Sequence, residues 1–186
     1  MLLYGDEKSG KKYILNSFIN CFHRDKKIFY ASLEDDHFSE KILEGISYFD
    51  VIVLDRLDLA PTNPHWEMGI FNLYNDSNKE GKNQIIFLSD KSLNSIDFNL
   101  KDLQSRISSI SAISFVDLND EEKRILMELI FRKRGISIDN SVLSYALERS
   151  SRSLENIINL VQKIDEYSLA KKRNITVPLL KEILES

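Results

Sequence analysis

The sequence predicts a doubly wound α/β domain, with a parallel sheet flanked by helices, followed by a small all-helical domain. Over the first part of the chain, short apolar runs that end in turn or acidic residues alternate with stretches of helical spacing. After about Val116 the strand-like runs stop and only helical patterns follow. The expected domains are therefore residues 1–116 and residues 117–186.

Five apolar runs predict the strands of the sheet. Each has four to six aliphatic or aromatic residues, typical of strands buried on both faces in a parallel sheet. They lie within residues 1–4, 26–32, 48–55, 83–90 and 110–117. Between them, apolar residues recur at helical spacing in residues 14–22 and 38–46, which predicts two helices that pack on the sheet.

The second domain carries start and stop signals for four helices. Asn119 with Glu122 predicts the start of the first helix, and Gly135 predicts its end. Asp139 could cap the second helix, and Thr176 with Pro178 predicts the start of the fourth. Apolar residues at helical spacing in residues 154–164 predict the long third helix. We expect these helices to form a separate small core.

Composition excludes several classes of protein. The chain has 186 residues, a formal net charge of -4, three histidines and one cysteine, Cys21. No window approaches about 18 consecutive apolar residues, so a membrane span is not expected. A lone cysteine makes no internal disulfide and fits a reducing cytoplasm, and the scattered histidines leave no zinc site. The acidic balance argues against a broad nucleic-acid-binding surface.

The first strand leads into a phosphate-binding motif. Residues 5–11 read G-x-x-x-x-G-K between a strand and a helix, with Gly5, Gly10 and Lys11 in the defining positions. Backbone N–H groups of such a loop face phosphate, and the lysine binds the β- and γ-phosphates. The next position holds Lys12, where a Ser or Thr hydroxyl would bind Mg²⁺. Since lysine cannot coordinate a cation, we expect little dependence on Mg²⁺.

Two further strands end in polar residues of the kind found beside bound phosphates. Asp55 ends the third apolar run, where a carboxylate would hold Mg²⁺ and water. The following residue is Arg56, where an active ATPase of this class carries a second acid, and Asp58 is expected to point elsewhere. Ser89 and Asp90 end the fourth run, where a polar side chain can touch the γ-phosphate. Efficient ATP hydrolysis is therefore not expected.

Two arginines are candidates for contacts with a nucleotide. Arg106 follows the last helical pattern of the first domain, from which a guanidinium can reach the nucleotide of a neighbouring subunit. A structural alternative is that Arg106 braces the junction between the domains through Asp102, one turn earlier. Arg152 opens the long helix of the second domain, where it could cover a nucleotide or simply face water.

These elements, in this order and spacing, resemble the DnaA branch of the AAA+ ATPases, and within it the DnaA regulatory inactivator (Hda) family. The resemblance covers essentially the whole chain. Its most specific segments are H-W-E-M-G-I-F-N-L-Y-N at 65–75 and R-N-I-T-V-P-L-L-K-E-I-L at 173–184. Residues 103–106 and 118–123 are similar to the family's sequence between core and lid. The resemblance implies a P-loop AAA+ core followed by a helical lid.

The resemblance also implies a function. Members pair with ATP-bound DnaA and promote hydrolysis of its nucleotide on DNA loaded with the polymerase sliding clamp, which restrains replication initiation in the bacterial cytoplasm. Arg106 would reach across the subunit interface, and Arg152 with the P-loop would hold ADP. The family's clamp-binding motif precedes the P-loop strand, with which this chain begins. Contact with DNA would be indirect, and self-association is possible within this scheme.

Two other functions fit the same residues. One is a working ATPase, a DnaA-type initiator or loader fragment, which would need a metal ligand other than Lys12 and a water-activating group other than Arg56. The other is a nucleotide-free adaptor that keeps the fold for protein contacts only. Titration with ADP and ATP distinguishes the adaptor from a nucleotide-binding regulator.

Overall fold

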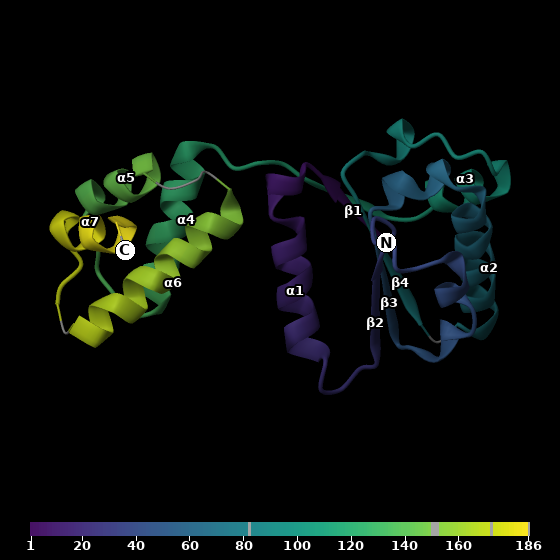
Figure 1. Cartoon of the computed structure of the whole chain (residues 1–186), viewed down its shortest axis with the longest axis horizontal. Helices are drawn as coiled ribbons and strands as arrows, with labels where there is room; N and C mark the ends of the chain where they lie inside the picture. The colour runs from purple at the N-terminus through teal and green to yellow at the C-terminus, as the bar shows by residue number, and fades with distance from the viewer. Residues whose placement is uncertain (82, 150–152, 172, 186) are drawn as a thin grey trace. The chain divides into compact units, whose positions relative to one another are not determined.

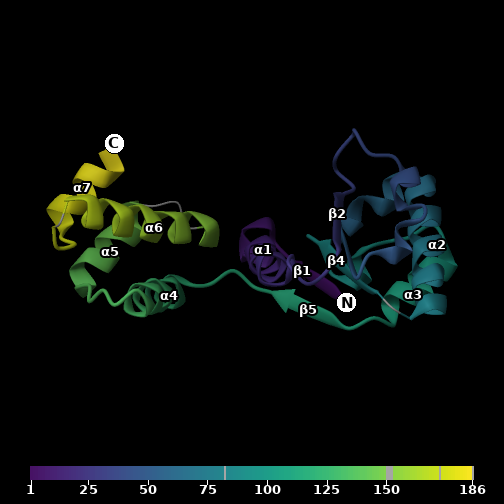
Figure 2. The same cartoon turned by 90° about the horizontal axis from the view of Figure 1, so that it is seen from below.

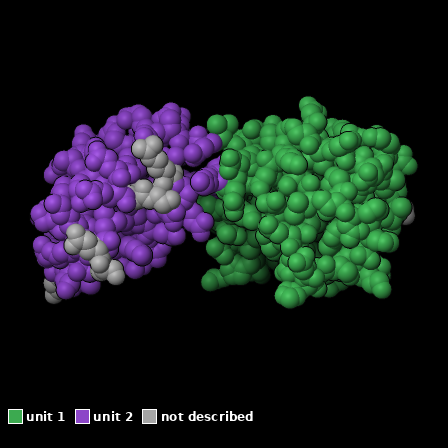
Figure 3. All heavy atoms as spheres, turned by 45° about the horizontal axis from the view of Figure 1, so that its top comes forward, with its two compact units in different colours: residues 1–7, 11–116 green, residues 8–10, 117–186 purple. Residues whose placement is uncertain are grey.

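The computed structural model describes residues 1–81, 83–149, 153–171 and 173–185. These residues form two compact units, one of residues 1–7 and 11–116 and the other of residues 8–10 and 117–186 (Figure 3). Each unit has its own apolar core. In the described part of the chain, no helix is both long enough and apolar enough to span a membrane.

The first unit is built on a five-stranded sheet (Figure 1). Its strands are β1 (Leu2–Gly5), β2 (Ile28–Ser32), β3 (Val51–Asp55), β4 (Gln84–Ser89) and β5 (Ala112–Phe115). They are ordered β2-β3-β4-β1-β5, and every neighbouring pair is parallel. Four fall within the predicted apolar runs and β1 extends one residue beyond its run, to Gly5, and the predicted α/β fold class is confirmed.

Helices cover both faces of this sheet (Figure 2). They are α1 (Lys11–Phe22), α2 (Pro64–Glu80) and α3 (Lys101–Ser108). Successive residues of a strand point to opposite faces, and β3 illustrates the result. Val53 packs with Leu15 of α1, whereas Leu54 belongs to the cluster that contains Ile70 of α2 and Leu103 of α3. Both faces of the central strands are therefore buried.

The segment between β2 and β3 differs from the prediction. Residues 38–46 were expected to form a helix, but the chain makes short 3₁₀ turns at Glu40–Leu43 and Ile46–Tyr48. Glu44, which is extended, and Gly45, which has a left-handed φ of +69°, separate the two turns and interrupt any helix. Leu43 and Ile46 are still buried in the core, so the apolar spacing reflects packing rather than an α-helix.

The second unit contains four helices around a core of its own. They are α4 (Asp120–Lys133), α5 (Asn140–Arg149), α6 (Leu154–Lys171) and α7 (Val177–Glu185). Asn119 and Glu122 form the predicted capping box at the start of α4. Apolar residues of all four helices, including Phe131, Leu143 and Val161, are fully buried in the core.

Candidate functional site

The polar residues predicted to meet a phosphate lie at the carboxyl edge of the sheet. Strands β3, β4 and β1 are neighbours and run parallel, so their carboxyl ends open on the same edge. Asp55 ends β3, Ser89 ends β4 and Gly5 ends β1. Ligands of open α/β sheets bind at this edge.

The loop after β1 requires glycine for two separate reasons. Gly5 has φ of +149°, and a Cβ there would lie 2.1 Å from the carbonyl oxygen of Phe115. Gly10 has φ of +84°, another conformation that favours glycine. Helix α1 begins at the next residue, Lys11. The predicted strand, loop and helix are therefore present in the order that a P-loop needs.

Lys11 is fully buried, which is rare for a lysine, and its ammonium is satisfied within the chain. Its Nζ donates to the carbonyl oxygens of Gly5 at 2.8 Å and of Asp6 at 3.2 Å. It also donates to Oδ1 of Asp90 at 2.6 Å, which forms an ion pair. The lysine that would bind phosphate is thus paired with a carboxylate from the end of β4.

Lys12 pairs with the carboxylate at the end of β3. Its Nζ lies 2.9 Å from Oδ2 of Asp55, whose side chain is fully buried. The same oxygen accepts a hydrogen bond from the hydroxyl of Tyr30 at 2.8 Å. Burial lowers the pKa of the Lys12 ammonium, but the hydrogen bond and the charge of Asp55 outweigh it, so the pKa lies above its ordinary value. Burial and the bond to Asp55 both raise the pKa of Tyr30.

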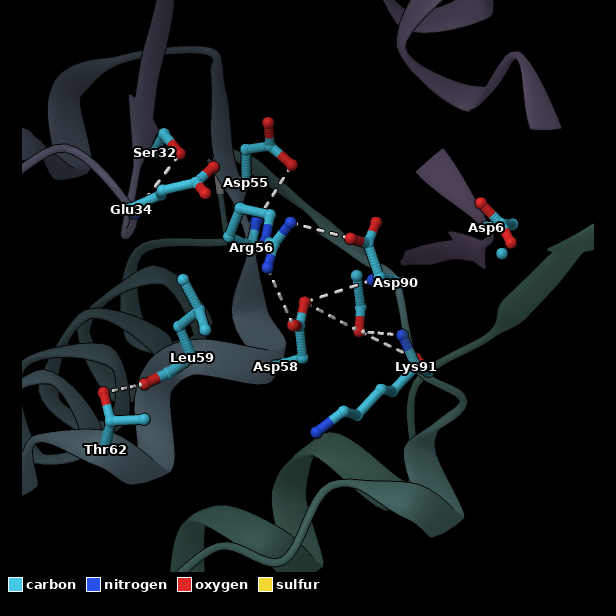
Figure 4. Close-up of polar contacts among 12 residues, drawn as sticks. Asp6, Ser32, Glu34, Asp55, Arg56, Asp58, Leu59, Thr62, Asp90 and Lys91 are labelled. Carbon is cyan, nitrogen blue, oxygen red and sulfur yellow. Dashed lines mark hydrogen bonds and ion pairs between the residues drawn. The ribbon is translucent and has the colours of Figure 1, made fainter. Parts of the chain in front are cut away.

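Arg56 contacts two carboxylates, that of Asp90, which also pairs with Lys11, and that of Asp58 (Figure 4). Its Nη1 donates to Oδ2 of Asp90 at 2.7 Å, and its Nη2 lies 3.5 Å from Oδ2 of Asp58. Burial lowers the pKa of the guanidinium, but the nearby carboxylates, Asp58 first and Asp90 next, raise it above its ordinary value. The Nε of Arg56 is buried and has no hydrogen-bond partner among the described residues. Arg56 therefore neutralises acids in the position where an active ATPase carries an acid.

The backbone explains why Asp58 enters this network. Arg56 has φ of +63° and ψ of +42°, and it is the one non-glycine residue with positive φ in the described part of the chain. This left-handed turn leads into the 3₁₀ segment Leu57–Thr62, and Asp58 accepts from the backbone N of Asp90 at 3.1 Å. The expectation that Asp58 points elsewhere is wrong, because the left-handed turn at Arg56 brings Asp58 to the end of β4.

Arg106 lies on α3, apart from this network. Its side chain is exposed, and within the described residues it makes no hydrogen bond or ion pair. It borders a pocket of about 480 Å³ that is also lined by Phe71, Asp102, Ser105 and Ser109. The alternative in which Asp102 pairs with Arg106 is not supported, since the structure has no such ion pair. The guanidinium is available for contact with another molecule.

Glu67 of α2 anchors the chain that leads into α3. Its carboxylate is almost completely buried and accepts hydrogen bonds from the backbone N of Asn99 at 2.8 Å and of Leu100 at 2.7 Å. Leu100 is the residue that precedes the first turn of α3. Glu67 therefore helps to fix the start of the helix that carries Arg106.

Comparison with known proteins gives a sequence match for the second unit and a structural match for the whole chain. Residues 120–184 match the family model described as the lid domain of Hda. Domain III of the Thermotoga maritima replication initiation protein DnaA superimposes with a TM-score of 0.68 at 14% identity, over 100% of this chain and 82% of that chain. Residues 120–184 therefore resemble the Hda lid, and the whole chain has the AAA+ fold seen in DnaA domain III.

Two other similarities set the limits of this assignment. A RuvB variant from Thermotoga maritima also gives a TM-score of 0.68 at 14% identity, over 99% of this chain and 60% of that chain. The fold of both units is therefore shared with RuvB, and the sequence match of residues 120–184 is what points to the Hda lid. An uncharacterized protein of Haemophilus influenzae is 28% identical over 184 residues, which is 98% of this chain and 80% of that protein. Lid and fold together make the chain similar to proteins of the DnaA branch.

Within this AAA+ core, the structure brings together most of the residues predicted for the site. Lys11 pairs with Asp90 and Lys12 pairs with Asp55, and both lysines directly follow the loop that Gly5 and Gly10 shape. Arg152 falls outside the described residues. Sequence reasoning missed Tyr30. An aromatic residue in an apolar strand does not reveal that its hydroxyl donates to Asp55.

Proposed function

We propose that this protein regulates replication initiation by acting on DnaA, and that it stimulates hydrolysis of DnaA-bound ATP through Arg106. The match of residues 120–184 to the Hda lid domain supports DnaA as the partner. The exposure of Arg106 carries the catalytic part of the proposal. An arginine that is held in an ion pair within its own chain would not be available to contact the nucleotide of a neighbouring subunit.

The chemistry requires only a positioned cation. During phosphoryl transfer, negative charge develops on the oxygens of the γ-phosphate and on the leaving oxygen. A guanidinium is always charged and can fork onto two phosphate oxygens. Arg106 would stabilise that charge from across a subunit interface, and a contribution of this kind is worth several kcal/mol. DnaA would supply the nucleotide and the attacking water.

The protein's own P-loop has a supporting role in this proposal. Amides of the loop at residues 5–10 and the ammonium of Lys11 would hold the diphosphate of ADP. The ion pair between Lys11 and Asp90 must open for this to happen, so we expect weak binding. Arg56 and Lys12 stand where an acid and a hydroxyl would be needed, so we propose that the protein does not hydrolyse ATP efficiently.

One observation favours a second function. Lys11, Lys12 and Arg56 are already paired with carboxylates of the same chain, which suits an adaptor that binds no nucleotide and acts through protein contacts alone. Isothermal calorimetry separates the two functions. Binding of ADP that Lys11→Ala weakens supports the regulator with a nucleotide, and no binding of ADP or ATP at millimolar concentration supports the adaptor.

The experiment that tests the proposed activity uses DnaA loaded with labelled ATP. Single-turnover hydrolysis is followed with and without this protein, first in solution and then on DNA that carries the sliding clamp. We expect this protein to accelerate hydrolysis in at least one of these conditions. Hydrolysis at the same rate with and without the protein, in both conditions, would reject the proposal.

A further inference from the structure

The fold family uses Mg²⁺ beside the P-loop, but the residues of this chain do not fit it. In related P-loop proteins, Mg²⁺ is held by a hydroxyl that follows the P-loop lysine and by a carboxylate at the end of a neighbouring strand. Here the hydroxyl position is Lys12, which has three donors and no acceptor. Its ammonium lies 2.9 Å from Oδ2 of the carboxylate at the end of β3, Asp55.

Both oxygens of the Asp55 carboxylate already accept from groups of the chain. Its Oδ2 accepts from Lys12 and from the hydroxyl of Tyr30, at 2.9 Å and 2.8 Å. Its Oδ1 accepts from the backbone N of Arg56 at 2.9 Å. Mg²⁺ demands oxygen ligands at about 2.0–2.1 Å in octahedral geometry. A metal at Asp55 would have to displace an ammonium and would then face its positive charge.

The other acids of the site are also neutralised from within. Asp90 pairs with Lys11 through Oδ1 and with Arg56 through Oδ2, at 2.6 Å and 2.7 Å. Asp58 lies 3.5 Å from Arg56. Asp55, Asp58 and Asp90 are thus each paired with a cation of the chain, so a divalent ion at any of them would have to compete with that cation.

We infer that Lys12 is a built-in cation that replaces Mg²⁺ at Asp55, so that the site takes a nucleoside diphosphate free of metal and Mg²⁺ opposes its binding. This inference rests on the proposed nucleotide site. Metal-free ADP offers its full negative charge to Lys11 and the loop amides. The Mg²⁺ complex of ADP has less charge to offer and carries its metal toward the ammonium of Lys12.

Calorimetry measures the sign of the Mg²⁺ effect. ADP is titrated into the full-length protein in a metal chelator and in millimolar Mg²⁺ at matched ionic strength. We expect ADP to bind about tenfold more weakly in Mg²⁺, which corresponds to about 1.4 kcal/mol. In Lys12→Ser, which restores a hydroxyl and frees Asp55, we expect Mg²⁺ to strengthen binding instead. Lys26→Ser, at an exposed lysine, should behave as the wild type.

A second measurement does not need nucleotide. Thermal unfolding is followed with and without Mg²⁺, again at matched ionic strength. We expect Mg²⁺ to leave the Tm of the wild type unchanged and to raise that of Lys12→Ser, in which the carboxylate of Asp55 has lost its cation. If no ADP binds to the wild type, the proposed nucleotide site fails, and this measurement alone decides the role of Lys12.

Three outcomes would overturn the inference. They are tighter binding of ADP by the wild type in Mg²⁺, a Tm of the wild type that rises with Mg²⁺ as much as that of Lys12→Ser, and no Mg²⁺ response in a folded Lys12→Ser. If Lys12→Ser does not fold, the wild-type protein still decides the matter. ADP binding that weakens in Mg²⁺, with an unchanged Tm, supports the inference, and ADP binding that strengthens in Mg²⁺ contradicts it.

Discussion

The ammonium of Lys11 and the carboxylate of Asp90 form a 2.6 Å ion pair, although the two residues are 79 positions apart. Lys11 is fully buried and begins α1, and Asp90 follows β4, the strand beside β1 in the sheet. The lysine that would bind phosphate thus already has an internal anion. A bound phosphate has to compete with that anion.

This competition predicts that removing the charge of Asp90 strengthens binding of phosphate groups. In Asp90→Asn, Lys11 and Arg56 lose a carboxylate at hydrogen-bond distance, and we expect ADP affinity to rise about tenfold, or about 1.4 kcal/mol. Calorimetry at constant ionic strength measures the change. Asp97→Asn is a suitable control because its side chain is 96% exposed. Equal affinities in the two variants would mean that Asp90 does not compete with phosphate.

The isolated protein is predicted not to hydrolyse ATP above the background of the buffer. Lys12 is bound to Asp55, and Arg56 stands where an acid would polarise the attacking water. A multiple-turnover phosphate-release assay at saturating ATP and Mg²⁺ measures the rate. Turnover that Lys11→Ala abolishes would show that the site hydrolyses ATP despite these residues.

Much of the core could be predicted from the sequence, because the signals there are local. The strands are short apolar runs, of which β3 is buried on both faces while the edge strand β5 is largely exposed, and Asn119 with Glu122 forms a capping box that depends on those two residues alone. The 3₁₀ turns at residues 40–48 were missed because spacing alone does not reveal how Gly45 turns the chain. The pairing of Lys11 with Asp90 could not be predicted either, since it depends on β1 and β4 being neighbours in the sheet.

The site shows the same division between local and long-range information. Lys12 and Arg56 signal an altered P-loop site by residue type alone. Their partners depend on the fold: Lys12 and Tyr30 share Asp55, and Arg56 reaches Asp58 through a left-handed turn. Glu67 marked a family resemblance in the sequence, whereas its hydrogen bonds to the start of α3 depend on the tertiary structure.

Glu67 is predicted to be important for stability. A buried carboxylate that accepts two backbone N–H groups contributes more than an exposed one, and hydrogen bonds to charged groups are worth about 1.5–3 kcal/mol each. Glu67→Gln can keep one of these bonds but presents an NH₂ group to the other donor, so we expect a loss of about 2 kcal/mol in the free energy of unfolding. Urea unfolding measures this loss. A variant as stable as Glu44→Gln, at an exposed glutamate, would contradict it.

The hydroxyl of Tyr30 predicts a dependence of stability on alkaline pH. Its pKa in the fold is raised above the ordinary 10.0 by burial and by Asp55. Above pH 10 the unfolded chain therefore binds fewer protons than the folded one, and this contribution to stability falls as pH rises. Tyr30→Phe should cost about 1 kcal/mol at neutral pH, where its hydrogen bond is intact.

The comparison between the two proteins gives the test. Urea unfolding of the wild type and of Tyr30→Phe is measured at neutral pH and at several values above pH 10. The difference between the two free energies of unfolding should shrink with rising pH. A constant difference over this range would mean that the phenol is not held in its protonated form by the fold.

The stimulation of DnaA through Arg106 is tested most directly by single-turnover hydrolysis of DnaA-bound ATP with Arg106→Ala. Lys101→Ala, at an exposed cation on the same helix, is the matched control. We expect both variants to keep the Tm and the ADP affinity of the wild type, since Arg106 makes no ion pair among the described residues. Arg106→Ala should lower stimulation by at least about 100-fold, the lower range for loss of a group that stabilises the transition state, and Lys101→Ala should not. Normal stimulation by a well-folded Arg106→Ala protein would contradict the account.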